Sequence, residues 1–381
     1  MKSGRMAAAL AALVTLLASG NAAAVKLQLS DEAFLDVRLL VQPQAQARQD
    51  GSADGDGVGS DFYLRRARLI LSGNVTKNIS FFLDTDAPNY GKGGKYDLNI
   101  FFLQDAFASF KIVPELTVDT GLIIAPLTHH TIQSAVSLNT LDYHAFMVKY
   151  PAGSNKVWRD VGVQLRGLFL GDRFQYRAGV WGGRRGESKR FDGPTALPDI
   201  NPNGVPRFAG QVRFNLLDPE SDFFFGGTYL RKKKVVSFGV AADYQPKVAA
   251  TGAEVRDYVA LGGDVFVDLP VLQASEIVFQ VNAINYWQGD LSPATGLALF
   301  AEAGYRWKWL GGVVSYERFV SKTGAGHLQA YHVGLNGWIE GHTANVKADL
   351  AFEQDCAAQK KTRLADAKTI AVFTLQTQLF F

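Results

Sequence analysis

Apolar and polar residues alternate in segments of about ten residues along most of the chain. The alternation is cleanest over 342–353, where Val346 and Leu350 belong to one face and Lys347 and Asp349 to the other. Successive side chains of a β-strand point to opposite faces, so each such segment predicts a strand with one apolar and one polar face.

Sixteen segments of this kind can be recognised, separated by turn residues such as Gly, Asn and Asp. They are 33–48, 62–72, 78–86, 98–111, 116–124, 159–170, 173–182, 206–217, 235–245, 256–268, 275–288, 296–308, 313–321, 327–338, 342–353 and 369–381. A soluble β-sandwich also alternates, but it rarely needs so many long strands. The pattern favours an all-β, transmembrane antiparallel barrel of sixteen strands.

The last thirteen residues, 369–381, show the same alternation and end on Phe381. Phe373, Leu375 and Leu379 fall on one face, and Gln376 and Gln378 on the other. In a membrane barrel the apolar face meets lipid and the polar face lines a wet lumen. A strand of this kind resembles the final strand of bacterial outer-membrane barrels.

Short and long connections alternate between the predicted strands, as expected for short periplasmic turns and long extracellular loops. The exception is 218–234, which contains the apolar run Phe223 to Leu230 and could be a seventeenth strand. A closed antiparallel barrel with both ends in the periplasm needs an even number of strands. We therefore expect 217–234 to lie together on the periplasmic side.

Residues 1–24 resemble a secretory signal, with Lys2 and Arg5 before a short apolar core and small residues at Ala22–Ala24. Residues 25–381 then form one domain, the barrel, because no linker or change of composition divides them. Loss of the signal would lower the formal net charge from +3 to +1, which argues against bulk attraction to nucleic acid. The single Cys356 allows no internal disulfide.

Several short motifs occur in the order found in one known family. They are Phe62 to Leu69 (FYLRRARL), Leu103 to Ala106, Gly121 to Pro126, Arg159 to Gly167, Tyr176 to Val180, Gly334 to Asn336 with Gly341 and His342, and Gln376 to Gln378. In these motifs the chain resembles the phosphate-selective porin O and P family. The resemblance implies a trimeric sixteen-stranded porin with an inward-folded third extracellular loop and a ladder of cationic residues in its lumen.

The third long loop, 125–158, is too apolar for a solvated surface loop, with Ile132, Leu138 and Leu141 among its residues. We expect it to fold into the barrel and narrow the lumen. Its cations are Lys149 and Lys156, and three histidines are able to add charge below neutral pH: His129, His130 and His144. The adjacent pair of histidines lacks a carboxylate or Cys at ligand spacing, so no metal site is expected.

The phase of the alternation directs eight further cations into the lumen: Arg38, Arg66, Arg68, Arg166, Arg177, Arg213, Arg306 and Lys347. Arg65 falls on the opposite phase. Rings of Arg and Lys favour anions in pores, and Arg suits phosphate oxygens through its two-pronged geometry. Six carboxylates share the inward phase, so the arginines could instead pair across the wall: Asp36, Asp84, Asp105, Asp264, Glu302 and Asp349.

These observations predict a porin of the bacterial outer membrane that admits small anions by passive diffusion, with phosphate or polyphosphate as the leading candidate. Its expected partners are outer-membrane lipid and lipopolysaccharide, two further copies of the chain and the permeating anion. A weakly selective general porin and a structural or adhesive barrel with a closed lumen stay open as alternatives. No catalytic or nucleotide motif has a credible context, so neither enzymatic activity nor a cofactor is expected.

Overall fold

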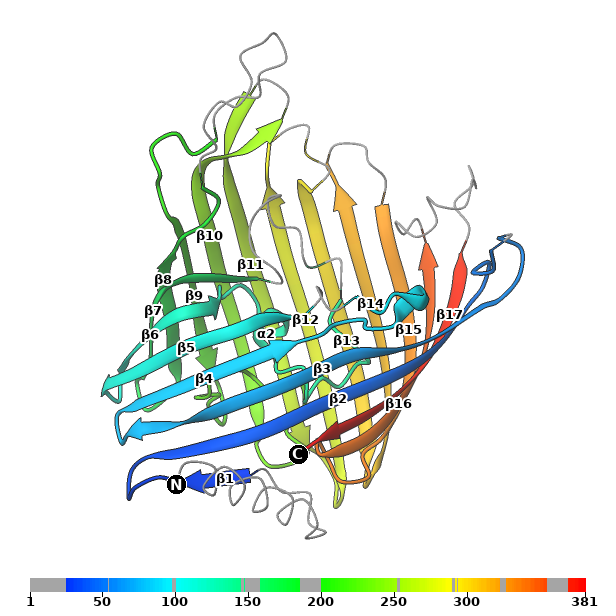
Figure 1. Ribbon diagram of the computed structural model, residues 1–381, viewed down its shortest axis with the longest axis horizontal. Coiled ribbons are helices and arrows are strands. Elements are labelled where there is room, and N and C mark those ends of the chain that lie inside the picture. The colour runs from blue at the N-terminus through cyan, green and yellow to red at the C-terminus, as the bar shows by residue number, and fades with distance from the viewer. Residues whose placement is uncertain are drawn as a thin grey trace, which may run out of the picture.

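The computed structural model of the chain is a β-barrel, shown as a ribbon in Figure 1. It describes residues 25–53, 55–97, 101–144, 147, 158–185, 200–251, 254–289, 292, 294–322, 327–354 and 369–381. The proposed signal segment, 1–24, lies outside the described residues. Among the described residues, no helix is long and apolar enough to cross a membrane.

Sixteen strands, β2 to β17, form the barrel, and each pairs antiparallel with its neighbours in the chain. Their bounds are Phe34–Arg48 (β2), Gly59–Thr76 (β3), Ile79–Asp86 (β4), Phe102–Val113 (β5), Leu116–Ile124 (β6), Arg159–Phe169 (β7), Phe174–Trp181 (β8), Arg207–Asn215 (β9), Val235–Thr251 (β10), Glu254–Pro270 (β11), Ser275–Trp287 (β12), Gly296–Trp307 (β13), Leu310–Ser321 (β14), His327–Gly337 (β15), Ala344–Gln354 (β16) and Ile370–Phe380 (β17). The predicted number and order of barrel strands are confirmed, with bounds shifted by a few residues.

Three short elements complete the fold. The strand β1 (Val25–Gln28), which the sequence pattern did not reveal, pairs with β2 outside the sixteen. The 3-10 helix η1 (Lys92–Gly94) lies in the loop after β4, and the single-turn helix α2 (His129–Ile132) lies in the loop after β6.

The barrel closes where β17 pairs with β2. Two glutamine side chains of each strand meet inside this seam: Gln42 donates to Gln378 and Gln44 to Gln376, both at 2.7 Å. Backbone hydrogen bonds between Leu39 and Phe381 extend the pairing. Because amides both donate and accept, these side chains satisfy each other on the inner face of the seam.

The two faces of β17 differ sharply in exposure. Phe373, Leu375 and Leu379 are 46%, 40% and 52% exposed on the outer surface, whereas Gln376 and Gln378 are each 1% exposed inside the barrel. Outward valine, leucine and aromatic side chains continue this apolar outer surface on most other strands. This is the reverse of a soluble protein, in which exposed faces are polar, and it fits a barrel surrounded by lipid.

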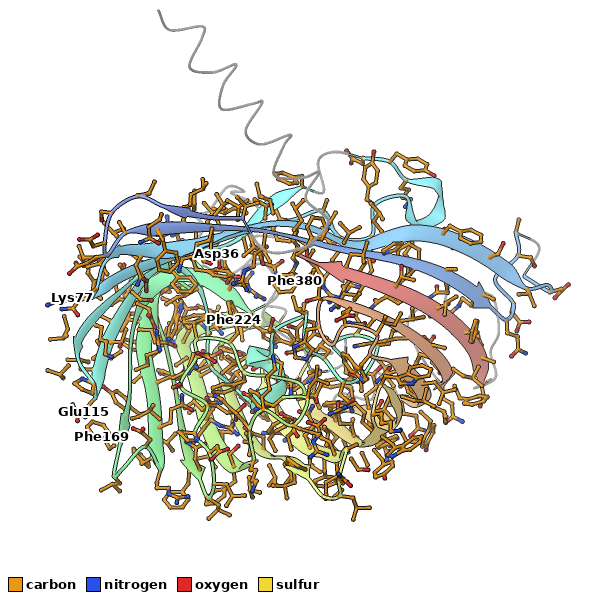
Figure 2. All side chains as sticks on the ribbon, turned by 90° about the horizontal axis from the view of Figure 1, so that it is seen from below. Asp36, Lys77, Glu115, Phe169, Phe224 and Phe380 are labelled. Atoms are coloured by element: carbon orange, nitrogen blue, oxygen red, sulfur yellow. The ribbon has the colours of Figure 1, made fainter. Side chains whose placement is uncertain are left out.

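The short turns and the C-terminal end of the chain lie at one end of the barrel, and the loop between β2 and β3 lies at the other (Figure 1). In the view from below, Lys77, Glu115 and Phe169 lie at the rim, whereas Phe224 lies inside the ring of strands (Figure 2). Phe224 belongs to 218–234, which we name the inserted turn. The expectation that this segment remains on the periplasmic side is wrong, because its apolar run folds back into the barrel.

The barrel interior is filled unevenly. The largest apolar cluster joins loop 125–158 and Phe225 to the inner faces of β10 to β15, through residues such as Ile132, Tyr258 and Phe300. Burial of these side chains fastens the loop to one half of the wall. The half formed by β2 to β5 keeps a polar lining, described next.

Candidate functional site

The described part of loop 125–158 crosses the barrel interior through hydrogen bonds to inward side chains. The backbone amides of His129 and His130 donate to Asp264 of β11 (3.1 Å) and Asn282 of β12 (3.0 Å). Further along, Lys347 of β16 donates to the backbone oxygens of Leu138 and Thr140. These contacts satisfy backbone groups that would otherwise be buried without partners.

His129 and His130 are buried, and each ring is hydrogen-bonded to neighbouring side chains. His129 Nε2 donates to Glu220 (2.8 Å) while its Nδ1 accepts from Gln133 (2.9 Å), which fixes its tautomer. Burial lowers the pKa of His129. The pKa of His130 is lowered to about 3, mainly by burial and to a smaller extent by the nearby His144. The expectation that these two add charge just below neutral pH is therefore wrong, because desolvation disfavours the charged ring.

The inserted turn meets this loop in the middle of the barrel. Phe225 forms a parallel bridge with Gln133, through Ser134 N to Phe225 O (2.9 Å) and Phe225 N to Ile132 O (3.2 Å). Glu220 of the turn accepts from His129. Two segments that enter from opposite ends of the barrel are thus joined into one internal body.

Asp142 anchors the loop to β3 by receiving hydrogen bonds from both Arg65 and Arg66. Burial would raise the pKa of Asp142, but the charges of the two arginines outweigh it and hold the pKa below its ordinary value. The assignment of Arg65 to the outer phase is wrong. A β-bulge opposite Pro43 shifts the register between Gln42 and Pro43, so neighbouring residues of β3 both turn inward.

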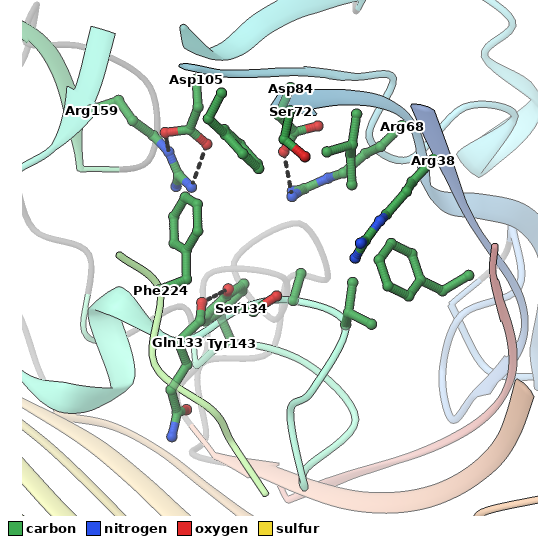
Figure 3. A pocket seen from close by; sticks show the side chains of 15 residues that line it. Arg38, Arg68, Ser72, Asp84, Asp105, Gln133, Ser134, Tyr143, Arg159 and Phe224 are labelled. Atoms are coloured by element: carbon green, nitrogen blue, oxygen red, sulfur yellow. Dashed lines mark hydrogen bonds and ion pairs between the residues drawn. The ribbon is translucent and has the colours of Figure 1, made fainter. Parts of the chain in front are cut away.

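A cavity of about 160 Å³ remains between the internal body and the wall of β2 to β5 (Figure 3). Arg38, Arg68 and Arg159 point into it together with Asp84 and Asp105. The opposite side of the cavity is formed by loop residues 133–136, by Tyr143, and by Phe224 of the inserted turn. The barrel-wall side of the cavity is therefore mainly polar, whereas the side formed by the internal body has both polar and apolar side chains.

The arginines around this cavity are engaged with carboxylates. Arg159 grips both oxygens of Asp105 at 3.0 Å, and Arg68 bridges Asp84 (3.0 Å) and Asp86 (2.9 Å). Among the described residues, Arg38 pairs with one carboxylate, Asp36, at 2.5 Å, and its guanidinium lies over the ring of Phe380. Its side chain is 40% exposed, so it is the cation of this cavity that is most open to water.

The other predicted lumen cations also contact groups inside the barrel. Their partners are Gln42 and Asp142 for Arg66, Asp119 for Arg166 (2.8 Å), the backbone oxygen of Asp222 for Arg177 (3.0 Å), Asp264 for Arg213 (2.6 Å), Glu276 for Arg306 (2.8 Å) and loop backbone oxygens for Lys347. Their inward orientation agrees with the phase, but the structure does not gather them into one column. Lys149 and Lys156 lie outside the described residues.

Several charged residues of the interior escaped the sequence reasoning, and three of them illustrate why. Arg207 pairs with Asp243 through two hydrogen bonds, and its phase, the same as that of Arg213, could have revealed it. Arg159 falls on the outer phase of β7 and turns inward where Trp158 adopts a φ of 62°. Asp142 has no periodic signal because it lies in a loop.

Residues 37–209 match the model of a family described as phosphate-selective porin O and P, as the sequence motifs indicated. A search of curated proteins found no match. Similar solved structures include the outer membrane channel DcaP of Acinetobacter baumannii (14% identity, 93% of this chain and 99% of that one, TM-score 0.58) and an anion-selective porin from Comamonas acidovorans (12%, 92% and 100%, 0.59). OprB of Pseudomonas putida is similar at 10% identity over 91% and 94%, with a TM-score of 0.60. At these identities the likeness shows a porin fold.

Proposed function

We propose that this porin-fold barrel belongs to the phosphate-selective porin O and P family, whose model matches residues 37–209, and that it is a passive outer-membrane channel for small anions, with phosphate as the leading candidate. The passage is the cavity between the internal body and the wall of β2 to β5. Arg38 of β2, Arg68 of β3 and Arg159 of β7 are the cationic residues at this cavity that would meet an anion.

The observation that carries the proposal is the division of the barrel interior. Apolar packing of loop 125–158 and Phe225 fills much of the half next to β10 to β15. The half next to β2 to β5 keeps a polar cavity, which is lined by two guanidinium groups of β2 and β3 and by a third from Arg159 of β7. An arginine presents several N–H donors in one plane, which suits the oxygens of a phosphate.

Pairing of these arginines favours a second candidate, a general porin of weak selectivity. Arg68 and Arg159 already use their donors on Asp84, Asp86 and Asp105, so their charge is largely balanced inside the wall. In that case Arg38 alone would give the cavity its preference for anions. The two candidates differ in how strongly the channel discriminates, and they share the same passage.

The remaining features of the proposal concern assembly and location. A segment 1–24 that is removed on export would deliver the barrel to the outer membrane, where its apolar belt contacts lipid and its long loops contact lipopolysaccharide. One similar structure, OmpT of Vibrio cholerae, is described as a trimer form, and we extend that state to this chain. Native mass spectrometry in mild detergent should give the mass of three mature chains, and a monomer alone would contradict this assignment.

Cysteine labelling tests where the passage lies. Cys356 is the only cysteine, so a Cys356→Ser background permits single reporters. Ser72 of β3 lines the cavity, whereas Ala330 of β15 is 1% exposed beneath the loop. In planar bilayers, Ser72→Cys should react with a small anionic methanethiosulfonate and lose current. Ala330→Cys, the matched control, should not change.

The chemistry of the reagent adds a second criterion. An anionic methanethiosulfonate should modify Ser72→Cys faster than a cationic one of similar size, because guanidinium groups concentrate anions near the reporter. Equal rates would leave the weakly selective porin as the better description. Failure of both reagents at Ser72, or equal block at Ala330, would show that ions do not pass along β2 to β5.

A further inference from the structure

Two histidines and a glutamate from three separate segments converge on the far side of the internal body. His144 belongs to loop 125–158, Glu317 to β14 and His332 to β15. One ligand atom from each lies within 4.8 Å of the other two. His144 Nδ1 is 3.3 Å from Glu317 Oε2, and His332 Nε2 is 3.6 Å from Glu317 Oε1.

Buried nitrogen and oxygen atoms of these three side chains lack a hydrogen-bond partner among the described residues. These atoms are His144 Nε2, Glu317 Oε2 and His332 Nε2. The side chains of His144 and Glu317 are 5% and 9% exposed. Buried polar atoms without partners are unfavourable, and a cation bound between the three side chains would satisfy those that face it.

The support around the cluster is that of a metal site. Asp349 of β16 accepts a hydrogen bond from His332 Nδ1 at 2.9 Å, so the Nε2 lone pair of that ring is directed at the cluster. Histidines that bind metals commonly donate their second ring N–H to a carboxylate in this way. The His144 ring stacks on Phe300 at 4.0 Å, and its backbone N–H donates to His130 at 3.3 Å.

We propose that His144, Glu317 and His332 bind one divalent transition metal ion, with Zn²⁺ as the best fit, and that the ion clamps loop 125–158 to β14 and β15. Two imidazoles and one carboxylate form a known zinc ligand set, which leaves the fourth position for water. Magnesium and calcium prefer oxygen ligands, so two nitrogen donors disfavour them.

Binding requires only a small contraction of the cluster. Zinc bonds to nitrogen and oxygen are about 2.0–2.2 Å long, so ligand atoms up to 4.8 Å apart must each move inward by roughly 0.7 Å. His144 lies on a loop and its χ angles allow this movement. Glu317 and His332 lie on adjacent strands of one hairpin, which fixes their spacing.

The clamp would act on the loop that borders the passage. The same loop residues that precede His144, among them Tyr143, line the cavity on its other face. An ion that joins His144 to β14 and β15 removes one way for this segment to move. Only this effect on the passage rests on the proposed channel function, because the metal site can bind its ion whether or not the barrel conducts.

Isothermal titration of the untagged protein with ZnCl₂ tests the binding. The full mature chain in detergent is first treated with chelator, and Cys356→Ser removes the thiol as a competing ligand. One ion per chain should bind in the micromolar range or tighter. His144→Ala and Glu317→Gln should each abolish the heat, and Asp349→Asn should weaken affinity by roughly 10–100-fold through His332.

His342→Ala is the matched control, because this histidine is half-buried beside Trp338 and lies outside the cluster. The His342→Ala variant should bind zinc as the parent does. Cu²⁺ supplies a second readout, since its electron paramagnetic resonance spectrum should show coupling to two nitrogens that fall to one in His144→Ala. Heat-modifiable migration of each variant in gel electrophoresis establishes that the barrel is folded.

Two outcomes would overturn the proposal. Absence of zinc binding to a folded protein at millimolar ZnCl₂ would mean that the cluster is held together only by the contacts of Glu317 with the two histidines. Binding that persists in His144→Ala and Glu317→Gln would place the ion elsewhere. If zinc binds but the barrel carries no current, the metal site stands and the proposed channel falls.

Discussion

Replacement of Arg38 by glutamine should weaken the preference of the channel for anions. Arg38 is the most exposed of the cavity arginines, with 40% of its side chain accessible and Asp36 as its carboxylate partner. Glutamine keeps a polar side chain of similar reach and removes one positive charge. It also leaves the Asp36 carboxylate without its cation, which adds to the effect.

The size of the change follows from the width of the cavity. An ion in a space of about 160 Å³ passes within roughly 6 Å of the guanidinium, where two unit charges in water interact by about 0.7 kcal/mol. Screening at 0.1 M salt lowers this to about 0.4 kcal/mol. An anion is favoured and a cation disfavoured by this energy, so the permeability ratio should fall about fourfold.

Reversal potentials in a tenfold KCl gradient measure that ratio. The Arg38→Gln channel should shift by on the order of 30 mV towards the cation potential. Lys77→Gln removes an exposed cation at the rim and is the matched control, expected to change little. Arg38→Lys keeps the charge and should keep the reversal potential, but it loses the two-pronged geometry for phosphate.

The reasoning would be refuted by an unchanged reversal potential in a folded Arg38→Gln channel. The cavity would then not lie on the path of the ions, or its charges would be balanced entirely within the wall. An equal shift in Lys77→Gln would instead mean that rim charges control selectivity.

Three further changes test other contacts. Asp142→Asn leaves Arg65 and Arg66 without their carboxylate, and it should weaken the attachment of the loop to β3 by about 2 kcal/mol, a value that allows for the partial exposure of Asp142. Protease cleavage of the loop should then accelerate roughly 30-fold. An unchanged cleavage rate would contradict the role of Asp142 as an anchor. Phe224→Ala removes a ring that faces the cavity and should raise single-channel conductance, whereas Phe62→Ala on the outer surface should not. His130 has a pKa lowered to about 3, so the unfolded chain binds more protons between pH 6.5 and 3, and stability should fall by about 1.4 kcal/mol per pH unit as pH decreases through that window. Thermal melts of His130→Gln in detergent should lose part of that slope, and a parent melt that does not depend on pH would contradict the assignment.

The barrel was predictable because a strand with one lipid face and one lumen face must alternate with period two. That rule placed Gln376 and Gln378 inside and Phe373 and Leu375 outside, as found. It also directed most of the lumen arginines inward. Their partners were less predictable, since the phase says which face a side chain occupies and not which carboxylate lies opposite.

Departures from regular strand geometry were beyond the periodic pattern. The bulge at Pro43 turned Arg65 inward, and the proline itself was the available signal, because proline within a strand is typical of edges and bulges. The left-handed backbone at Trp158 redirected Arg159. In both cases one residue of irregular geometry reverses the face assigned to a charged neighbour.

The inserted turn was missed for a different reason. The requirement for an even number of strands correctly excluded Phe223 to Leu230 from the barrel wall. It did not predict where three consecutive phenylalanines that do not face lipid would be buried. Their burial needs an apolar partner, and loop 125–158 supplies it through Ile132 and the parallel bridge at Gln133. Such a pairing of two loops depends on their meeting in space, which no local pattern records.

The most direct test of the central claim is single-channel recording of the purified protein in planar bilayers, first in KCl and then with added phosphate. The account predicts discrete conductance steps, a reversal potential on the anion side, and chloride current that falls as phosphate occupies the arginine-lined cavity. A protein that inserts as a folded barrel but shows no conductance steps would contradict it and would favour a closed structural barrel.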